Sequence, residues 1–237
     1  MCGRFALTSS IQDLFETFDL TAGADLAPHY NIAPGTAIPV VREGENAREL
    51  VFLHWGFVPH WAKKEPDKLL INARGETLGE KPSFRDAARK RRCLVPADGF
   101  YEWQRSGKKP QPYFVRPKEN VGPIAYAGIW DAWQTPSGEI METVAIITTN
   151  ANETLQSIHH RMPVVIAHED FDHWLNAEIG EEALELLKPA DNTFFEAIAV
   201  GSAVNKVANN GPEVQEQASK GDLQASSDTQ LSLFGRQ

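Results

Sequence analysis

The second residue of the chain carries the most distinctive chemistry. Loss of Met1, by an aminopeptidase or by the protein itself, would leave Cys2 at the N-terminus as a 1,2-aminothiol. An N-terminal amine has an ordinary pKa of about 7.7–8.0 and a thiol about 8.5, so part of the amine is unprotonated near neutral pH. Such an amine forms a Schiff base with an aldehyde, and the adjacent thiolate can then close a thiazolidine ring. The alternative is that Cys2 is an inert residue in a frayed terminus.

Polar residues that could hold an anion or orient a substrate occur at two places. Near the N-terminus, Arg4 offers a planar fork of donors that suits a phosphate. In INARGET (71–77), Asn72 can both donate and accept hydrogen bonds. Arg74 and Glu76 follow at intervals of two residues, which places all three side chains on one face of a strand. The same pattern also fits a polar strand edge or a turn.

Two further segments contain candidates for proton transfer. Glu102 lies between two aromatic residues in PADGFYEW (96–103). A buried carboxylate is costly unless it is paired or protonated, and either state suits a proton-transfer group. His159 and His160 are adjacent in IHHRMP (158–163), and histidine is the side chain that titrates near neutral pH. The alternatives are a structural glutamate and a surface histidine.

The sequence gives no sign of a metal or cofactor site. In an extended segment His159 and His160 would point in opposite directions, and no third ligand follows at a metal-binding spacing. The two cysteines, Cys2 and Cys93, exclude a four-cysteine zinc site and a disulfide framework. We expect no cofactor, and Cys93 fits a buried core residue.

The elements that must position these residues are mainly strands. Segments rich in β-branched and aromatic residues, with Gly, Pro or Asn nearby, predict strands at 49–58, 92–103, 111–116, 124–133, 142–150, 162–167 and 194–200. Helical spacing predicts helices at 8–18, from about 83, at 168–176 and at 181–188. Strands without regular alternation with helices favour an α+β fold with a mainly antiparallel sheet. The segment TTNANETLQS, 148–157, is expected to be a loop.

The charge of the 237-residue chain limits its partners. Lys and Arg number 23 and Asp and Glu 32, giving a net charge of −9, which argues against general coating of nucleic acid but permits a local basic groove. The segment 81–92 holds six basic residues and is either such a groove wall or a solvated helix face. No apolar run approaches the ~18 residues of a membrane-spanning helix, and no secretory signal opens the chain. We therefore expect a cytoplasmic protein.

The chain divides into a domain over 1–208 and a polar segment over 209–237, which we expect to be a disordered tail. Near its end, QLSLF (230–234) matches the pentapeptide that binds bacterial sliding clamps. Its residues are Gln230, Leu231, Ser232, Leu233 and Phe234. The leucine and phenylalanine of such a peptide would dock in an apolar pocket while the glutamine adds hydrogen bonds. The alternative is a tail that ends in apolar residues by chance.

Taken together, six motifs occur in the order of one family: MCGRF (1–5), YNIAP (30–34), WGFVP (55–59), INARGET (71–77), VPADGFYEW (95–103) and IHHRMP (158–163). Over residues 2 to about 208 the sequence resembles the SRAP family, the SOS-response-associated peptidases, which sense abasic sites in single-stranded DNA. The resemblance implies a single domain with a mainly antiparallel, curved β-sheet core flanked by helices.

The resemblance also implies a mechanism. Met1 is lost, and Cys2 forms a thiazolidine with the ring-opened aldehyde of an abasic deoxyribose, a crosslink that shields the lesion. Asn72 would position the N-terminal residue, and Glu102 would carry protons during imine formation. His159 would donate a proton to the ring oxygen of the sugar. Holding the aldehyde beside the aminothiol supplies an effective concentration that free cysteine lacks.

DNA contacts follow from the same resemblance. The implied contacts are Arg4, Arg74 and Arg161 on phosphates, Pro34 and Trp61 as apolar wedges or stacking platforms, and Arg85 in a basic groove wall. Ala62 stands where some members of the family have a second tryptophan. We expect a monomer that binds single-stranded DNA near the nucleoid and has no membrane partner. Two alternatives are a peptidase that uses the N-terminal cysteine on other peptides and a non-covalent single-strand DNA or clamp adaptor.

Overall fold

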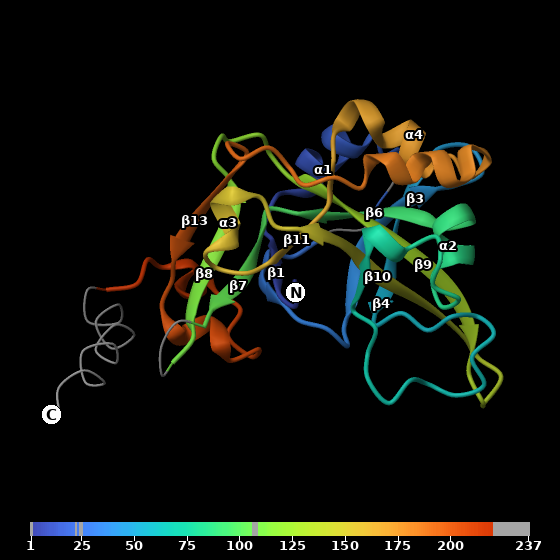
Figure 1. Cartoon of the computed structure of the whole chain (residues 1–237), viewed down its shortest axis with the longest axis horizontal. Coiled ribbons are helices and arrows are strands. Elements are labelled where there is room, and N and C mark those ends of the chain that lie inside the picture. The colour runs from blue at the N-terminus through green and yellow to red at the C-terminus, as the bar shows by residue number, and fades with distance from the viewer. Residues whose placement is uncertain (1, 22, 24–25, 106–108, 220–237) are drawn as a thin grey trace, which may run out of the picture.

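Two β-sheets form the body of the protein (Figure 1). The computed structural model describes residues 2–21, 23, 26–105 and 109–219, so the QLSLF motif lies outside the described residues. The first sheet consists of β3 (Ala37–Glu43), β4 (Arg48–Trp55), β5 (Asn72–Arg74), β6 (Arg92–Ala97), β9 (Ile124–Gln134), β10 (Ile140–Asn150), β11 (Arg161–Pro163) and β12 (Val165–Ile166). Within it, β10, β4, β3, β6 and β9 close into a barrel because β9 also pairs with β10.

The second sheet stands beside the barrel and has the strand order β13-β8-β7-β1-β2. Its strands are β1 (Phe5–Leu7), β2 (His29–Ile32), β7 (Gly99–Gln104), β8 (Gln111–Pro117) and β13 (Phe195–Ala199). Among the described strands, β10 pairs in parallel with β4 and β5, and the other pairings of named strands are antiparallel. This confirms the predicted α+β fold with a curved, mainly antiparallel core.

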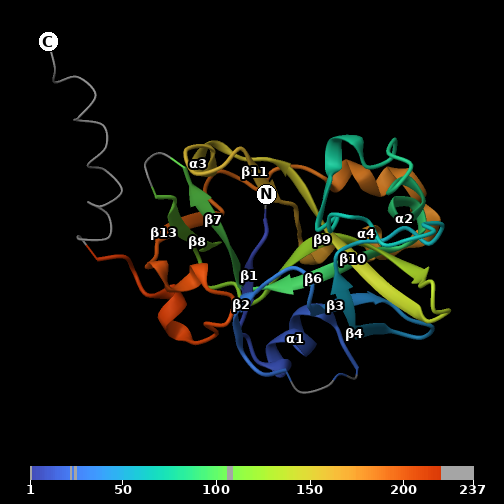
Figure 2. The same cartoon turned by 90° about the horizontal axis from the view of Figure 1, so that it is seen from below.

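Short helices lie around the sheets (Figures 1 and 2). The α-helices are α1 (Ile11–Phe18), α2 (Arg85–Lys90), α3 (Glu153–Gln156) and α4 (Phe171–Leu175). The 3-10 helices are η1 (Gly75–Thr77), η2 (His168–Asp170), η3 (Ala177–Leu186), η4 (Ser202–Asn205) and η5 (Pro212–Gln215). Helix α3 corrects the expected loop over 148–157: the Asn152 side chain caps its first turn by accepting from the Leu155 N–H.

Asp98 divides the segment predicted as one strand over 92–103. Residues before it form β6 of the barrel, and residues after it form β7 of the second sheet. The Asp98 carboxylate accepts hydrogen bonds from the hydroxyl groups of Thr8 and Ser9 at 2.7 and 2.6 Å, which fix the crossing point beside the end of β1. This break carries Glu102 out of the barrel and onto the sheet that also contains β1.

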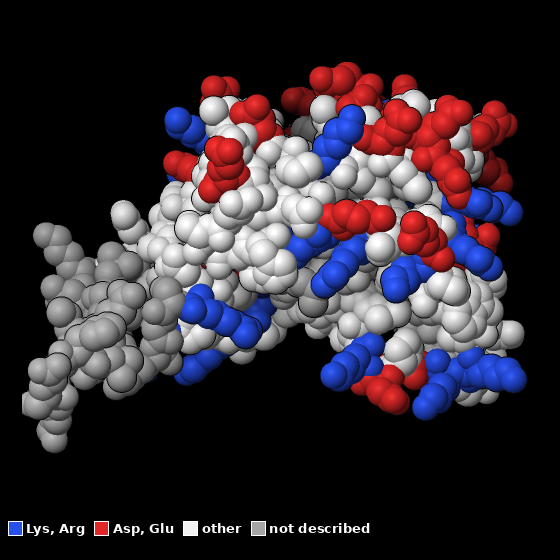
Figure 3. Space-filling model, viewed as in Figure 1, with Lys and Arg blue, Asp and Glu red and all other residues white. Residues whose placement is uncertain are grey.

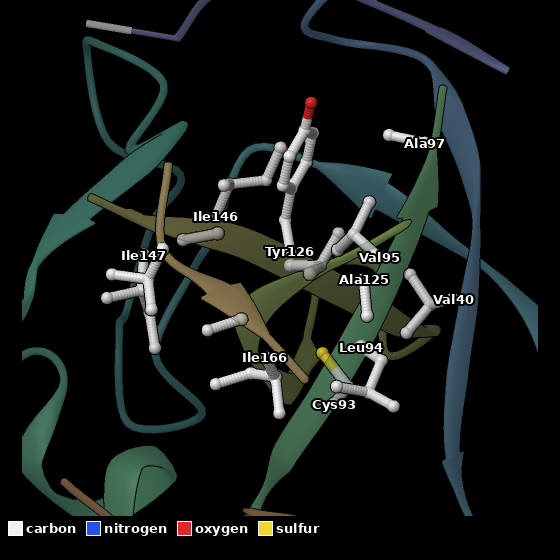
Figure 4. Packing of buried hydrophobic residues seen from close by; sticks show 14 of the residues in the cluster. Val40, Cys93, Leu94, Val95, Ala97, Ala125, Tyr126, Ile146, Ile147 and Ile166 are labelled. Atoms are coloured by element: carbon white, nitrogen blue, oxygen red, sulfur yellow. The ribbon is translucent and has the colours of Figure 1, made fainter. Parts of the chain in front are cut away.

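The core around the barrel contains both aliphatic and aromatic side chains. Val95 and Tyr126 are paired in register on β6 and β9, and Figure 4 shows them in one cluster with Ile146, whereas Leu94 lies on the opposite face of β6. Cys93 is fully buried, as predicted for a core cysteine, and faces Gly128 so closely that a Cβ at that glycine would lie 2.8 Å from the sulfur. No helix among the described residues is long and apolar enough to span a membrane.

The prediction that the tail begins at residue 209 is wrong for its first part. Residues 212–215 form η5, whose Val214 is fully buried, and Gln217 forms a β-bridge with Val200. Val214 packs in an apolar cluster with Tyr101 and Phe114 of the second sheet, and this burial favours an ordered conformation of a polar stretch.

Candidate active site

Segments from distant parts of the sequence meet where the chain enters β1. Figures 1 and 2 both place this point between the two sheets. β5 supplies Asn72, β7 supplies Glu102, and the turn between α3 and β11 supplies His159. A hydrogen bond from Asn72, the charge of Glu102 and the contact of Glu102 with His159 link these residues to Cys2. The structure thus brings together all four residues predicted to be catalytic.

Asn72 holds the backbone of Cys2. Its Nδ2 donates to the Cys2 carbonyl oxygen at 2.8 Å. β5 pairs in parallel with β10, where Asn72 is in register with Ile146, and this pairing fixes the position of the amide. The other side-chain atom, Oδ1, is buried and has no hydrogen-bond partner among the protein atoms. An unsatisfied buried acceptor is costly, which is typical of a site awaiting a donor.

The Cys2 side chain is fully buried in this form of the chain. Burial raises the pKa of its thiol, and the negative charge of Glu102 raises it further. The thiol is therefore protonated at neutral pH and is a poor nucleophile. A reaction at this sulfur requires a nearby group to accept the proton. Glu102 is a candidate, because its carboxylate is close enough to raise the pKa of the thiol.

Glu102 and His159 lie together and are candidates for proton transfer. Glu102 is 5% exposed, and its Oε1 lies 3.8 Å from Nδ1 of His159. The Arg161 backbone N–H lies 3.0 Å from this Nδ1, and the Arg161 carbonyl oxygen lies 3.3 Å from it. Burial lowers the pKa of His159, while the charge of Glu102 opposes that effect. Burial thus favours the neutral form of His159.

The two adjacent histidines do not point in opposite directions as predicted. Their rings lie 4.3 Å apart at an interplanar angle of 31°, because the chain turns between α3 and β11 and is not extended there. His160 is exposed and covers one face of His159. Across the described part of the chain, no three His, Cys, Asp or Glu side chains form a group that could hold a metal ion.

Arg4 is held along one edge of its guanidinium. Nη1 donates to Oδ1 of Asn31 at 2.7 Å and to the carbonyl of Val204 at 2.9 Å. Nε is buried and has no hydrogen-bond partner among the described residues, and Nη2 makes no hydrogen bond to them. The guanidinium also lies 5.8 Å from the ring centroid of Trp103. An arginine fixed in this way can direct Nη2 at a phosphate or carboxylate.

Arg74 and Arg161 differ from each other. Arg74 ends β5, is exposed and has no ion pair within the residues described. Arg161 is 5% exposed and donates to both carboxylate oxygens of Glu76, to Oδ1 of Asn150 and to the Thr148 carbonyl. A phosphate at Arg161 would have to displace Glu76, so this arrangement does not support the predicted contact.

Glu76, the ion-pair partner of Arg161, does not lie on the predicted strand face. The strand predicted to continue to Glu76 ends at Arg74 and gives way to η1. Glu76 therefore leaves the face of Asn72 and Arg74 and turns toward β11. This bidentate ion pair fastens η1 to the strand that follows His159.

The predicted wedge residues lie at the ends of barrel strands. Pro34 is half-buried in the turn between β2 and β3, where Gly35 has a φ of +82°. Trp61 is 56% exposed in the loop after β4. Its neighbour His60 is anchored to Asp131, whose Oδ2 accepts from the His60 backbone N–H at 2.9 Å and lies 3.0 Å from Nδ1. The loop thus presents the indole of Trp61 to solvent.

The basic segment 81–92 is in part structural, which corrects the prediction of a continuous groove wall. Arg92 is buried and donates to the backbone carbonyls of Ala88, Trp174, Asn176 and Gly180. Arg89 and Arg91 pair with acidic side chains of η3 and α2. Arg85 begins α2, is exposed and makes no ion pair with any described residue. Of the predicted wall, Arg85 therefore remains a candidate contact.

Charge is separated across the surface despite the net charge of −9. Figure 3 shows Asp and Glu gathered over the upper edge, around α4, whereas Lys and Arg surround the hollow in the lower middle. In the same view the chain enters β1 at that hollow. The site therefore opens onto the basic side of an acidic protein, as an anionic ligand requires.

Sequence reasoning missed Asn31 and Trp103, which shape the site. Asn31 contacts Arg4, and Nε1 of Trp103 donates to Oδ1 of Asn205 at 2.7 Å. Both residues lie inside motifs noted above, YNIAP and VPADGFYEW. The signal available was a fully polar side chain within an apolar strand, since Asn31 is completely buried.

A closed barrel stands beside a second sheet, and Cys2 lies near an asparagine, a carboxylate and a histidine. The chain belongs to the SOS response associated peptidase (SRAP) family, whose model matches residues 1–207. The expected family is confirmed.

Known relatives agree with this assignment. The chain is 42% identical over 224 residues to "Abasic site processing protein YoqW" of Bacillus subtilis, covering 91% of this chain and 99% of the relative. It is 35% identical over 220 residues to "Abasic site processing protein HMCES" of Gallus gallus, covering 78% and 65% of the two chains. A crystal structure of a protein from Bacteroides thetaiotaomicron superposes with a TM-score of 0.84 at 28% identity, covering 92% and 100%.

Proposed function

We propose that this protein processes abasic sites in single-stranded DNA by forming a thiazolidine crosslink through Cys2 after Met1 is removed. One observation carries the proposal: Asn72 holds the Cys2 carbonyl at 2.8 Å, while Glu102 of the second sheet lies 3.8 Å from His159 in the turn before β11. The relatives named abasic site processing proteins support DNA as the substrate class.

The first step is removal of Met1. Water adds to the Met1 carbonyl carbon, the bond from that carbon to the Cys2 nitrogen breaks, and free methionine leaves. The Cys2 nitrogen takes up a proton as it departs, and Glu102 is placed to relay it. Asn72 holds the carbonyl of Cys2 and so keeps the new amine in place. The alternative is removal of Met1 by an aminopeptidase, which would make the same aminothiol.

The crosslink forms in two further steps. The amine attacks the aldehyde carbon of the opened sugar, and loss of water gives an iminium; protonated His159, beside Glu102, gives a proton to the sugar ring oxygen as the ring opens. The Cys2 sulfur then bonds to the iminium carbon, the π pair moves to nitrogen, and the thiol proton passes to Glu102. These proton transfers also run in reverse, so the crosslink can be released.

DNA is held by the basic side of the molecule. Nη2 of Arg4, which makes no hydrogen bond to the described residues, and the exposed Arg74 support contacts with phosphates that flank the lesion. Trp61 and Pro34 offer stacking surfaces of the kind that bind single strands with little sequence preference. Together these contacts favour DNA over a peptide as the substrate.

The proposal is tested with single-stranded DNA that carries one abasic site, beside an intact strand. A heat-stable band on a denaturing gel, formed with abasic DNA by protein that lacks Met1, is the expected result. The band should vanish with Cys2→Ala and weaken to a labile imine with Cys2→Ser, whose hydroxyl closes the ring poorly. Absence of a band with correctly processed protein would contradict the proposal. Cleavage of unstructured peptides would instead favour the peptidase alternative.

A second proposal concerns recruitment. The sequence QLSLF at 230–234 matches a sliding-clamp-binding pentapeptide at all five positions and supports attachment to the replication machinery in the cytoplasm, near the nucleoid. A peptide of residues 225–237 should bind a bacterial sliding clamp at micromolar concentration. A peptide in which Leu233 and Phe234 are replaced by alanine is the matched control. Equal binding of both peptides, or of neither, would contradict this proposal.

A further inference from the structure

The chain beyond β13 returns across the second sheet as a strap, defined here as residues 201–218. It contains η4 and η5 and buries Val204 and Val214. Its end is held by the bridge between Val200 and Gln217 and by the Ala218 N–H, which donates to the Ala199 carbonyl at 2.9 Å. Residues 208–218 lie beyond the part of the chain that the family model matches.

Asn31 of β2 joins this strap to the site. The side chain is completely buried. Its Nδ2 donates to the backbone carbonyls of Lys206 at 3.0 Å and Asn209 at 2.8 Å, with a longer contact of 3.3 Å to that of Val204. Its Oδ1 accepts from Nη1 of Arg4 at 2.7 Å. One amide therefore binds the strap with one end and the arginine with the other.

The strap in turn contacts Arg4 directly. The Val204 carbonyl accepts from the same Nη1 at 2.9 Å. Both contacts fall on one nitrogen, and the Nε–Nη2 edge keeps no protein partner at Nε although that atom is buried. A long side chain normally loses much rotamer freedom when it grips a ligand, and a side chain fixed beforehand loses less.

We infer that Asn31 is a positioning residue for DNA: it locks the strap in place, and with the Val204 carbonyl it holds Nη1 of Arg4, which leaves Nη2 to bind a backbone phosphate. The inference rests on the proposed function, because it assigns Arg4 to a phosphate. It adds that residues outside the catalytic group, 201–218 among them, set the affinity for DNA.

The test measures binding to single-stranded DNA that carries a tetrahydrofuran abasic analogue, which cannot react with an amine. We expect Arg4→Ala and Asn31→Ala each to weaken binding on the order of tenfold. Each should also reduce the slope of log affinity against log salt by about 0.7, the value for one phosphate contact on a single strand. Asn192→Ala, an asparagine on a surface near α3, is the matched control and should change neither quantity.

A double-mutant cycle separates positioning from a general structural role. If Asn31 acts through Arg4, then Asn31→Ala should add little to the loss already caused by Arg4→Ala. Additive losses, or an unchanged salt slope in Asn31→Ala, would overturn the inference. If Asn31→Ala does not fold, Asn31→Ser enters the same cycle, since its hydroxyl can still donate to the strap but is too short to reach Arg4.

Failure of the inference is distinguishable from failure of the proposed function. Wild-type protein that does not crosslink reactive abasic DNA would contradict the proposed function. Wild-type protein that does crosslink, together with additive losses in the cycle, would contradict the role of Asn31 alone.

Discussion

The side-chain amide of Asn72 donates to the carbonyl oxygen of Cys2 at 2.8 Å, and this contact joins the first described residue of the chain to a strand of the barrel. Because β5 is held by its pairing with β10, the position of Cys2 is set by the barrel and not by the terminus itself. A residue so near the end of a chain would otherwise fray.

Replacing Asn72 should therefore loosen the nucleophile. In Asn72→Ala we expect retention of the fold and a fall of about 10- to 100-fold in the rate of crosslinking, the cost of misplacing a reacting group by about 1 Å. The rate is measured on gels with protein whose mass shows that Met1 is absent. Asn192→Ala again serves as the control, and an unchanged rate in Asn72→Ala would contradict the positioning role.

His159 should govern the alkaline side of the pH profile. Burial holds its pKa below the ordinary 6.5, so its protonated form, the stronger acid, increases as the pH falls toward that pKa. The Cys2 amine needs the opposite, because its reactive neutral form increases as the pH rises past about 7.7–8.0. Crosslinking by the wild type is expected to show a bell-shaped profile between these limits.

The His159→Gln variant should lose the fall in rate on the alkaline side and keep only the rise with pH. His160→Gln, a change of the exposed neighbour, should keep the bell shape. Rates of crosslinking from pH 5.5 to 9 measure this difference. Identical profiles for the two variants would show that His159 does not donate the proton.

Removing one buried hydroxyl should stabilise the fold. The Tyr126 side chain, labelled in Figure 4, is fully buried, and its hydroxyl has no hydrogen-bond partner among the described residues. An unsatisfied buried group costs about 1–3 kcal/mol, so Tyr126→Phe should raise the free energy of unfolding by about 1 kcal/mol. Urea denaturation measures the change, with the half-buried Tyr113→Phe as the control. A clear loss of stability would mean that the hydroxyl has a partner such as an ordered water.

Truncations should separate the strap from the residues after it. Deletion of 220–237 is expected to leave the melting temperature and the crosslinking rate unchanged. Deletion of 209–237 also removes Val214 and the Asn209 carbonyl that Asn31 binds, and should destabilise the protein by about 2 kcal/mol or more. Thermal unfolding of both truncated chains measures this. Equal stability would contradict the structural role of residues 209–218.

The sequence was sufficient to predict which residues meet beside Cys2 but not their environment. Strand-forming patterns predicted β4, β6, β9 and β10, because a buried sheet selects β-branched residues, but they missed β3 of the barrel. The crossing at Asp98 was not visible, since its cause is a set of hydrogen bonds from Thr8 and Ser9, about ninety positions away in the chain. Residue type could not separate Arg161, enclosed by Glu76, from the exposed Arg74, because that difference is one of tertiary contacts.

The predicted start of the tail at residue 209 was wrong for a related reason. Composition alone gives 209–219 too few apolar residues to form a core of its own. The stretch is ordered because Val214 packs against the second sheet and the Asn31 side chain donates to the Asn209 carbonyl. Local composition cannot report a surface supplied by another part of the chain.

The most direct test of the central claim is the mass of the crosslinked peptide. After reaction with abasic DNA, nuclease and trypsin digestion should release Cys2–Arg4 carrying the sugar remnant, with no thiol free for alkylation and no mass gain on borohydride treatment. That result identifies a thiazolidine at the N-terminal cysteine. A sugar remnant on a lysine peptide, or on Cys2–Arg4 with its thiol still open to alkylation, would contradict the account.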